Sequence, residues 1–455
     1  MGRGYPWGRP RIRANASGQT NITYRNFALS QVERVEGEGA TPRTPAPGPS
    51  FSRVLRNPSF FRVWLAQIIS QSGDFIFEVA LIWLVLELTH SVFDVALIVT
   101  VTILPSVILG PFLGVYVDRW DRRKLLLVTN VAEGFVVALL ALVVLGGHES
   151  LPLVLGVVFV LGAAGRLVFV ATEAYVPSLL AVEDLNASNG LLSLSGSLNQ
   201  ILGLSLGGIF VALLGVSVPM EYDAVTFFVA AFLLSRIRSP SPAPLPPGGS
   251  REPPSLLREM REGLAFVRRN RFMVEIIIIG MLVNFFGNGV GALFAPYASY
   301  VLHGGSAVYG FLGAAVATGT LVGAAVIGKL DTRRATGMYL FAGGVAIGLV
   351  VLALGVVTST PLALLCMLGL GITLMAANLP MTTLLQAKVP GELRGRVMSV
   401  FFSLAVAISP VGPIAVGALA THTSISFAFL LSGIVISVIM GVGFLTMSTL
   451  RRIHY

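Results

Sequence analysis

Long apolar runs separated by short polar turns make up most of the chain between residues 58 and 448. An α-helix needs roughly 20 predominantly apolar residues to cross a bilayer. Twelve runs fit this requirement and predict membrane-spanning helices at residues 62–86, 93–117, 125–146, 152–176, 190–215, 220–236, 273–298, 307–328, 337–357, 361–387, 397–419 and 425–448. Because a membrane β-barrel would show shorter segments of alternating polarity, we expect an all-α polytopic membrane protein.

Three polar segments lie outside this pattern. Residues 1–57 are rich in Arg, Pro, Gly and Ser, which is typical of a disordered tail, and no apolar core follows the first arginines as it would in a signal peptide. Residues 237–271 join the sixth and seventh spans. Dense prolines exclude a regular helix in the first half of this segment. In its second half, the apolar spacing over 255–270 predicts a basic amphipathic helix on the membrane surface. Residues 449–455 form the C-terminal segment.

The two sets of six spans resemble each other. YVPSLLAVEDLNASNGLLS after the fourth span is similar to KVPGELRGRVMS after the tenth. Gly203 and Gly208 in the fifth span have the same spacing as Gly412 and Gly417 in the eleventh. We therefore expect two pseudo-symmetric six-helix halves, an arrangement typical of secondary transporters. The N-terminal half covers residues 58–236 and the C-terminal half covers residues 272–448.

The charges indicate an orientation in the cell membrane. Only 12% of the 455 residues are charged, with a net charge of +9. If the N-terminus is cytoplasmic, all 31 Lys and Arg residues except Arg166 lie on the cytoplasmic side. By the positive-inside rule, both termini are then cytoplasmic. The basic residues are explained by topology, so no nucleic-acid partner is expected.

The sequence contains no recognisable catalytic or cofactor motif. The one cysteine, Cys366, lies in an apolar run, and the five histidines lie in turns or near the ends of the chain. No phosphate-binding loop is present that would bind ATP. We predict no cofactor, no metal site and no enzyme activity, which leaves a secondary transporter as the main expectation.

A charged turn, GVYVDRWDRRK, joins the second and third spans. Its residues resemble the signature Gly-x-x-x-Asp-Arg-x-Gly-Arg-Lys/Arg of the major facilitator superfamily, with Asp121 in place of the second glycine. Asp tolerates a left-handed turn better than most residues. FRVWLAQIISQSGDFIFEVALIWLVLELTHS and LLQAKVPGELRGRVMSV are similar to the enterobactin-exporter and macrolide-efflux branch, which holds drug:proton antiporters. The matching turn residues are Gly114, Asp118, Arg119, Arg122 and Arg123.

The resemblance implies a conformational role for this turn. Asp118 would face the N-terminal end of the eleventh span, which carries a partial positive charge. Arg122 would hold Asp118 in place and reach Glu173 at the end of the fourth span. These contacts would act as a latch that favours the outward-open state. The alternative is that the turn serves topology alone.

Polar residues on the first span form one helical face, made of Gln67, Gln71, Asp74 and Glu78. Ionisable groups inside a membrane are candidates for function. Because two acids this close repel each other when both are ionised, we expect one of them to bind a coupling proton near physiological pH. The alternative is that both carboxyl groups are simply hydrogen-bonded to Ser, Thr or Asn on neighbouring helices.

Two further groups are candidates for coupling or for substrate binding. Arg166 shares a face of the fourth span with Glu173, and Glu133 lies at a similar depth in the third span. We expect one of these glutamates to form an ion pair with Arg166. The pair would act as a structural salt bridge, in proton transfer or in recognition of substrate charge. The second half offers amide side chains and nearby phenylalanines that suit a bulky, largely apolar substrate. These cavity candidates are Asn284, Asn288, Asn378 and Gln386.

The main hypothesis is proton-driven export of an amphiphilic small molecule, such as a drug, a macrolide or a siderophore, by alternating access. The expected partners are the substrate, protons and the lipid bilayer, and the expected state is a monomer. A lysolipid flippase or an uptake facilitator of the same fold is one alternative. A non-transporting membrane sensor or scaffold is the other.

Overall fold

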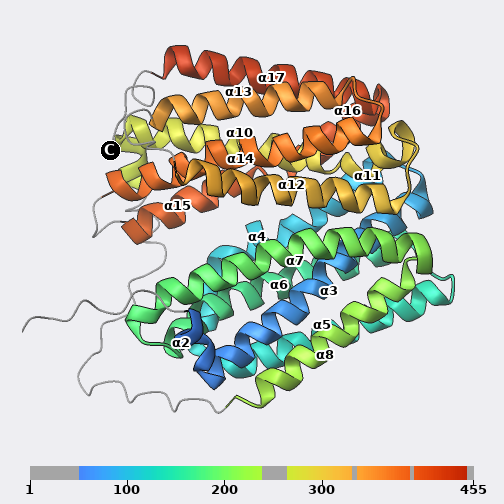
Figure 1. Ribbon diagram of the computed structural model, residues 1–455, viewed down its shortest axis with the longest axis vertical. Helices are drawn as coiled ribbons and strands as arrows, with labels where there is room; N and C mark the ends of the chain where they lie inside the picture. The colour runs from blue at the N-terminus through green and yellow to red at the C-terminus, as the bar shows by residue number, and fades with distance from the viewer. Residues whose placement is uncertain (1–50, 238–263, 330–335, 390–393, 448–455) are drawn as a thin grey trace, which may run out of the picture. The chain divides into compact units, whose positions relative to one another are not determined.

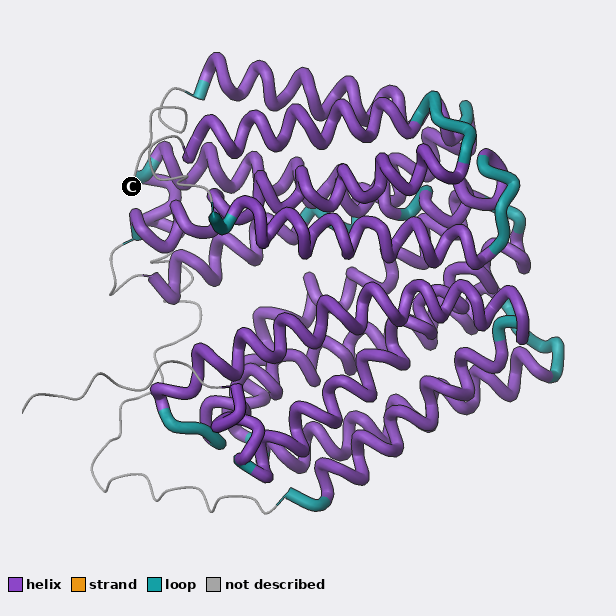
Figure 2. The backbone as a smooth tube through the Cα atoms, in the orientation of Figure 1, coloured by secondary structure: helices purple, strands orange, loops and turns teal. Residues whose placement is uncertain are grey.

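The computed structural model describes residues 51–237, 264–329, 336–389 and 394–447. All described secondary structure is helical, and the helices are joined by short loops (Figures 1 and 2). Twelve segments are long and apolar enough to cross a membrane, which confirms the twelve predicted spans. Some side chains within these helices, including those of Gly114, Asp118, Arg119 and Gln386, are outside the description.

The elements follow the predicted ranges closely, with ends that differ by a few residues. The first half contains α2 (Phe51–Arg56), α3 (Pro58–Thr89), α4 (Val92–Arg119), α5 (Arg122–Leu145), α6 (Leu151–Tyr175), η1 (Val176–Ser178), η2 (Val182–Asp184), α7 (Leu185–Leu214) and α8 (Ser217–Ser235). The second half contains α10 (Arg271–Gly291), α11 (Phe294–Pro296), the π-helical η3 (Tyr297–Val301), α12 (Ser306–Ile327), α13 (Thr336–Leu354), α14 (Thr360–Lys388), α15 (Arg394–Ala407), α16 (Val411–His422) and α17 (Ile425–Thr446).

The predicted disordered tail over 1–57 is wrong for its last seven residues. Residues 51–56 form α2, in which Val54 is fully buried. The Asn57 side chain then caps α3 by accepting a hydrogen bond from the Ser59 backbone N–H. Packing of Val54 against the helices explains why this short segment is ordered without any apolar periodicity of its own. Residues 1–50 lie outside the described residues.

Only the end of the predicted amphipathic segment is described. Residues 264–269 are helical, and Val267 is 4% exposed within the hydrophobic core of the bundle. This side chain therefore faces protein rather than lipid. Residues 238–263, which include most of the predicted surface helix, lie outside the described residues.

The glycine repeat is used in the same way in both halves. A Cβ atom on Gly203 of α7 would strike the Phe75 side chain of α3, and a Cβ atom on Gly412 of α16 would strike the Phe285 backbone of α10. The fifth span therefore packs against the first as the eleventh packs against the seventh. This correspondence confirms the predicted internal repeat.

The second glycine of each pair contacts the opposite half. Gly208 of α7 packs against Gly310 of α12, and Gly417 of α16 packs against Ala96 of α4. The Ser306 hydroxyl also donates a hydrogen bond to the Gly208 carbonyl oxygen at 3.1 Å. These contacts join the halves near the turns that connect α3 to α4, α7 to α8 and α16 to α17. We call this side of the bundle the α3–α4 end, and the opposite side the α4–α5 end.

The eleventh span is interrupted where it meets the first half. α15 ends at Ala407 and α16 begins at Val411. Proline has no backbone N–H and disfavours a continuous helix, which explains a break at Pro410. The Pro410 carbonyl oxygen accepts a hydrogen bond from the Thr100 hydroxyl of α4 at 3.1 Å. The break thus provides a second polar contact between the halves.

Candidate functional site

The polar face of α3 begins with two glutamines and ends with two acids. Gln67 donates a hydrogen bond to the Thr172 hydroxyl of α6 at 3.0 Å, and Gln71 donates to Gln67 Oε1 at 3.3 Å. Asp74 and Glu78 are exposed, and neither carboxyl group is hydrogen-bonded to another described side chain. The alternative in which Ser, Thr or Asn neighbours bind both carboxyl groups is therefore wrong for this structure.

A third acid, Asp223 of α8, lies directly behind α3. Its side chain and that of Thr226 fill the space beside Gly73, where any Cβ atom would collide with them. Asp223 is 1% exposed. The Thr226 hydroxyl lies 3.3 Å from Oδ1, and Oδ2 has no partner among the described atoms. Since consecutive residues of an α-helix are about 100° apart, Asp223 and Asp74 lie at adjacent faces of the same turn of α3.

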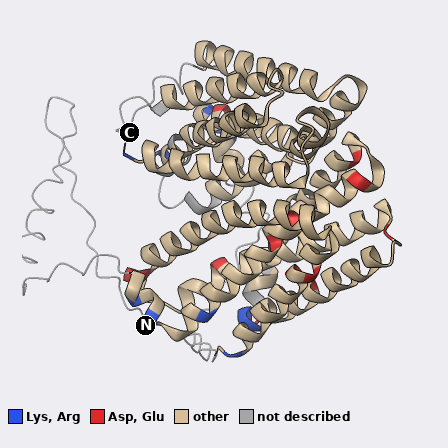
Figure 3. Ribbon diagram, turned by 45° about the vertical axis from the view of Figure 1, so that its right-hand side comes forward, with Lys and Arg blue, Asp and Glu red and all other residues tan. Residues whose placement is uncertain are grey.

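A fourth acid, Glu133 of α5, joins this group. It is 4% exposed, and the neighbouring Gly134 packs against the ring of Phe228 on α8. Like Asp223, Glu133 has no ion-pair partner among the described residues. Figure 3 shows how the acidic positions gather in the helices of the first half, whereas the second half is largely uncharged.

Asp223 was not among the site residues predicted from the sequence. The predicted sixth span began at residue 220, which placed Asp223 at the membrane border, but α8 begins at Ser217 and Asp223 lies in its second turn. An acid so far inside an apolar helix was a signal that could have identified it. The sequence did not reveal that α3 would cross α8 at a glycine.

The predicted ion pair of Arg166 is not present. Among the described residues, neither Glu133 nor Glu173 forms a salt bridge with it. The Arg166 guanidinium instead lies 5.0 Å from the centre of the Phe169 ring on the same helix. Its Nε is buried without a partner, and Glu173 is exposed. The shared helical face was correct, but helical spacing alone did not identify the neighbours of that face.

The arginines of the charged turn bind helix ends. Arg122 donates to the Ala174 carbonyl oxygen at 3.0 Å, so it reaches the end of α6 beside Glu173. Arg123 donates from Nε to the Leu234 carbonyl oxygen at 3.0 Å and from Nη2 to the Ser235 carbonyl oxygen. A cation at the C-terminal end of a helix stabilises it. Arg123 therefore fixes α5 to α8, a role that the sequence did not reveal.

Asp121 corrects one expectation about this turn. Its backbone is extended, with φ −64° and ψ 107°, rather than left-handed. Its side chain accepts a hydrogen bond from the Lys124 N–H at 3.1 Å. Asp121 is thus the N-cap of α5, for which aspartate is well suited. The Asp118 side chain and residues 390–393 lie outside the described residues, so the latch stays a prediction.

The amide candidates of the second half lie on two helices. On α10, Asn284 donates to the Gly280 carbonyl oxygen at 2.9 Å, and Asn288 donates to the Asn284 carbonyl oxygen at 2.8 Å. On α14, Asn378 is exposed, and the Gln386 side chain is outside the description. Both α10 amides use their N–H groups within their own helix, which leaves their carbonyl oxygens as acceptors.

An apolar cavity of about 160 Å³ lies inside the second half, between α10, α12, α13, α14 and α17. Phe286 and Phe294, two of the phenylalanines noted beside the amides, contribute to its wall. Hydrocarbon atoms make up nearly all of the exposed lining. Other side chains of the wall include Val283, Ile347, Ile436 and Met440.

A common register relates the first helices of the two halves. A Cβ atom on Gly203 would meet the Ser72 carbonyl oxygen, and one on Gly412 would meet the Phe285 carbonyl oxygen, so Ser72 corresponds to Phe285. The N-caps Asn57 and Asn270 have the same offset. Gln71 is then equivalent to Asn284, whereas Asp74 is equivalent to Gly287 and Glu78 to Gly291. The second half therefore carries glycines where the first half carries acids.

A second set of contacts extends this register. Gly134 of α5 packs against Phe228 of α8, and Gly344 of α13 packs against Met440 of α17. Glu133 therefore lies where α13 has Gly343, and the equal turns before α8 and α17 place Leu431 at the position of Asp223. The buried acids of the first half thus correspond to the region of the apolar cavity in the second.

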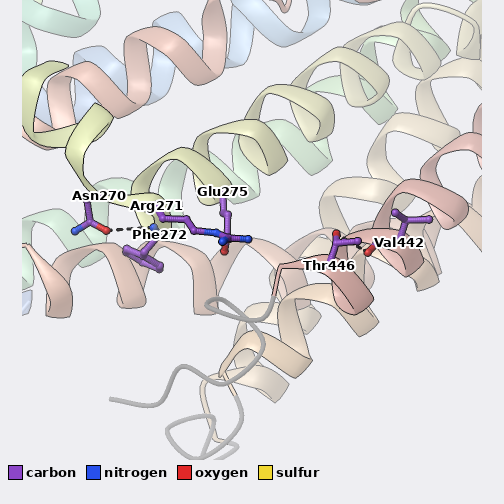
Figure 4. Close-up of polar contacts among 6 residues, drawn as sticks. All are labelled: Asn270, Arg271, Phe272, Glu275, Val442 and Thr446. Carbon is purple, nitrogen blue, oxygen red and sulfur yellow. Dashed lines mark hydrogen bonds and ion pairs between the residues drawn. The ribbon is translucent and has the colours of Figure 1, made fainter.

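The one buried acid described in α10 has a cation beside it. Arg271 Nε lies 2.8 Å from Glu275 Oε1, one turn after Asn270 caps the helix by accepting from the Phe272 N–H at 3.1 Å. Figure 4 shows these residues at the start of α10, with the Thr446 hydroxyl donating to the Val442 carbonyl oxygen nearby on α17. Among the described residues, no group of three His, Cys, Asp or Glu side chains is arranged to hold a metal ion.

Comparison with known proteins agrees with this architecture. The chain matches the family described as transmembrane secretion effector (MFS_3) over residues 50–453. It is 24% identical to macrolide efflux protein A of Streptococcus pyogenes, covering 83% of this chain and 93% of that protein. It is 26% identical to the multidrug efflux pump Tap of Mycobacterium tuberculosis, covering 82% of this chain and 90% of the pump.

A solved structure shows the same fold. A bacterial homologue of the human lysosomal transporter Spinster, in an inward-facing and unoccupied conformation, aligns with a TM-score of 0.69 at 14% identity. The alignment covers 91% of this chain and 98% of that one. At this level of identity the likeness concerns the fold alone.

Proposed function

Because the chain belongs to the transmembrane secretion effector family of the major facilitator superfamily, it is a multi-pass membrane transporter and not an enzyme, and we propose that it exports amphiphilic small molecules in exchange for protons. The substrate would cross by alternating access between the two halves. Substrate, protons and the lipid bilayer are the partners in this proposal, and a monomer is the working unit.

The observation that carries the proposal is the pair of exposed, unpartnered acids on α3. Asp74 and Glu78 are neither neutralised by a cation nor hydrogen-bonded to another described side chain. Burying such groups against lipid would be unfavourable. A site that binds and releases protons needs carboxyl groups that water can reach in part of the cycle, and these two meet that requirement.

The choice of substrate class rests on two supports. The relatives named above are a macrolide efflux protein and a multidrug efflux pump. The second half also offers an apolar cavity and amide oxygens rather than fixed charges. Both features suit a molecule with a large apolar body and a few polar groups, such as a macrolide or a lipophilic cation.

The test is transport by the purified protein in proteoliposomes with an imposed pH gradient. Erythromycin and ethidium serve as probes, one a macrolide and one a lipophilic cation. We expect movement of at least one probe against its concentration gradient, and loss of that movement when an ionophore collapses the pH gradient. Transport that continues without the gradient, or that needs a sodium gradient, would refute proton coupling. Transport only down a concentration gradient would favour a facilitator.

We also propose that the α4–α5 end faces the cytoplasm. The turns at the α3–α4 end carry no Lys or Arg, as expected for external turns. In a Cys366→Ala background, Glu149→Cys and His303→Cys should react with an impermeant thiol reagent added outside intact cells. Asp121→Cys and Ser250→Cys should not react. The reverse labelling pattern would overturn the orientation.

A further inference from the structure

The two halves differ at the place where the first, third and sixth helices of each half meet. In the first half, Asp223 of α8 lies directly against Gly73 of α3, and Glu133 is buried on α5. In the second half, α10, α13 and α17 line an apolar cavity, and α17 has the apolar Leu431 at the position of Asp223. The two buried carboxyl groups therefore distinguish the first half from the second.

No cation neutralises Asp223 among the residues that the structure describes. The elements packed against α8 contribute Asp74 from α3 and Glu133 from α5, both acids, and α7 contains no charged residue. On α8 itself, Thr226 is the hydrogen-bonding neighbour. Arg123 contacts α8 at its far end, at the Leu234 and Ser235 carbonyl oxygens. An ionised carboxylate that is buried without a partner is strongly unfavourable.

Gly73 connects this buried site to the exposed one. Because it has no side chain, the Asp223 carboxyl group lies against the backbone of α3, one residue from Asp74. We propose that Asp223, together with Glu133, forms a second proton-binding site behind α3 and exchanges its proton with Asp74. This inference rests on the proposed proton-coupled function and adds a residue to it.

The exchange is a simple proton transfer. The O–H bond of one carboxylic acid breaks as an O–H bond forms on a carboxylate oxygen of the other, directly or through one water molecule. No electrons are transferred, and the total number of bound protons changes only when Asp74 exchanges with water. The buried pair would hold the proton while Asp74 is in contact with the substrate pathway.

The test is infrared spectroscopy of the purified full-length protein during transfer from H₂O to D₂O. A protonated buried carboxyl group gives a C=O band that shifts slowly on deuteration. We expect such a band in the wild type, its loss in Asp223→Asn, and its retention in Glu275→Gln, which removes a buried carboxyl group from the second half. If the buried proton leaves through Asp74, the band should exchange more slowly in Asp74→Asn.

Each outcome decides the inference. Absence of an Asp223-dependent band across the accessible pH range would overturn it, as would an exchange rate that Asp74→Asn leaves unchanged. The Asp74→Asn measurement uses an intact Asp223, so it remains informative if Asp223→Asn fails to fold. In proteoliposomes, a folded Asp223→Asn should lose erythromycin or ethidium transport driven by the pH gradient. If the wild type moves neither probe, the proposed function fails, while the spectra still decide the proton site.

Discussion

The two halves share a framework and differ in chemistry. In each half, one glycine contacts the first helix of that half and a second glycine contacts the opposite half. These pairs are Gly203 and Gly208 in α7, and Gly412 and Gly417 in α16. Within this framework, Asp74 and Glu78 of α3 correspond to Gly287 and Gly291 of α10. Both acidic positions of the first half are therefore occupied by residues without a side chain in the second. The chain thus contains a natural comparison between an acidic and an uncharged version of the same helix.

This difference indicates a division of labour. Helix contacts are constrained in both halves, because backbones that approach closely require small residues. The positions beside those contacts are free to diverge, and they have diverged into an acidic site and an apolar cavity. A transporter that couples two ligands benefits from keeping the ion site and the apolar site on different halves, because both then respond to the same movement between the halves.

The largest expected effect comes from making the first half uncharged like the second. Asp74→Asn keeps nearly the shape of the side chain but cannot ionise, so it should remove proton coupling while preserving shape. We expect transport of erythromycin or ethidium against a gradient to fall by about 10²-fold or more, since positioned proton transfer contributes roughly 10²–10⁴-fold. Glu78→Gln should have a smaller effect. Probe binding to Asp74→Asn should persist in equilibrium dialysis.

A double variant would test whether position or identity matters. Asp74→Asn combined with Gly287→Asp moves the acid to the equivalent place in the second half, where no atom lies within 4 Å of a Cβ built at Gly287. The buried acids remain in the first half, so the moved carboxyl group has no partner for proton exchange and transport should stay low. Recovery of uphill transport would contradict the division of labour between the halves.

The sequence predicted the framework well for physical reasons. The length and apolarity of each span are local properties, and glycine spacing records where helices approach. The twelve spans and the internal repeat therefore follow from the order of residues alone. The polar face of α3 was also predicted, because residues that share a helical face are fixed by spacing alone.

The sequence-based predictions that were wrong or incomplete concern features that depend on which helices become neighbours. Asp223 was missed because its importance arises only where α8 crosses Gly73 of α3. The ion pair of Arg166 was wrong because spacing along one helix does not identify the adjacent helix. Helix α2 was missed because its six residues are ordered by the burial of Val54 against other segments. Arg123 had a role that required the end of α8 to be located.

An intermediate effect is expected at the contacts between the halves. Gly208→Val and Gly417→Val would each force a side chain into the opposite half. Overpacking costs about 1–3 kcal/mol, which changes a two-state equilibrium by about 5- to 150-fold. Both variants should open the α3–α4 end. Distances between spin labels at His90 and Thr421, which border the same surface pocket, should lengthen.

The matched control for these variants is Gly156→Val, because no atom lies within 4 Å of a Cβ built at Gly156. Its label distances should equal those of the wild type. If only one of the two variants, Gly208→Val or Gly417→Val, opens the α3–α4 end, then the two contacts do not stabilise the closed end equally.

The smallest expected effect concerns the charged turn, where the halves also differ. GVYVDRWDRRK in the first half has a shorter counterpart, GKLDTRR, in the second. Asp118→Asn keeps the size of the side chain and removes the charge that we expect to face the start of the eleventh span. An interaction with a helix N-terminus contributes about 0.3–1 kcal/mol when exposed and up to about 2 kcal/mol when partly buried. Because about 1.4 kcal/mol is a factor of ten, the equilibrium should shift about 2- to 30-fold.

The direction of this shift follows from where the contact forms. The predicted latch exists only when the α4–α5 end is closed, so its loss should favour the state that is open at that end. Spin-label distances between the α4–α5 ends of α4 and α15 should lengthen, while topology and expression are retained because all four cations of the turn remain. Asp331→Asn, in the shorter counterpart, is the matched control and should shift the distances less. Equal shifts in both variants would show that the two turns act alike. Unchanged distances in Asp118→Asn, with transport intact, would reduce the charged turn to a topology signal.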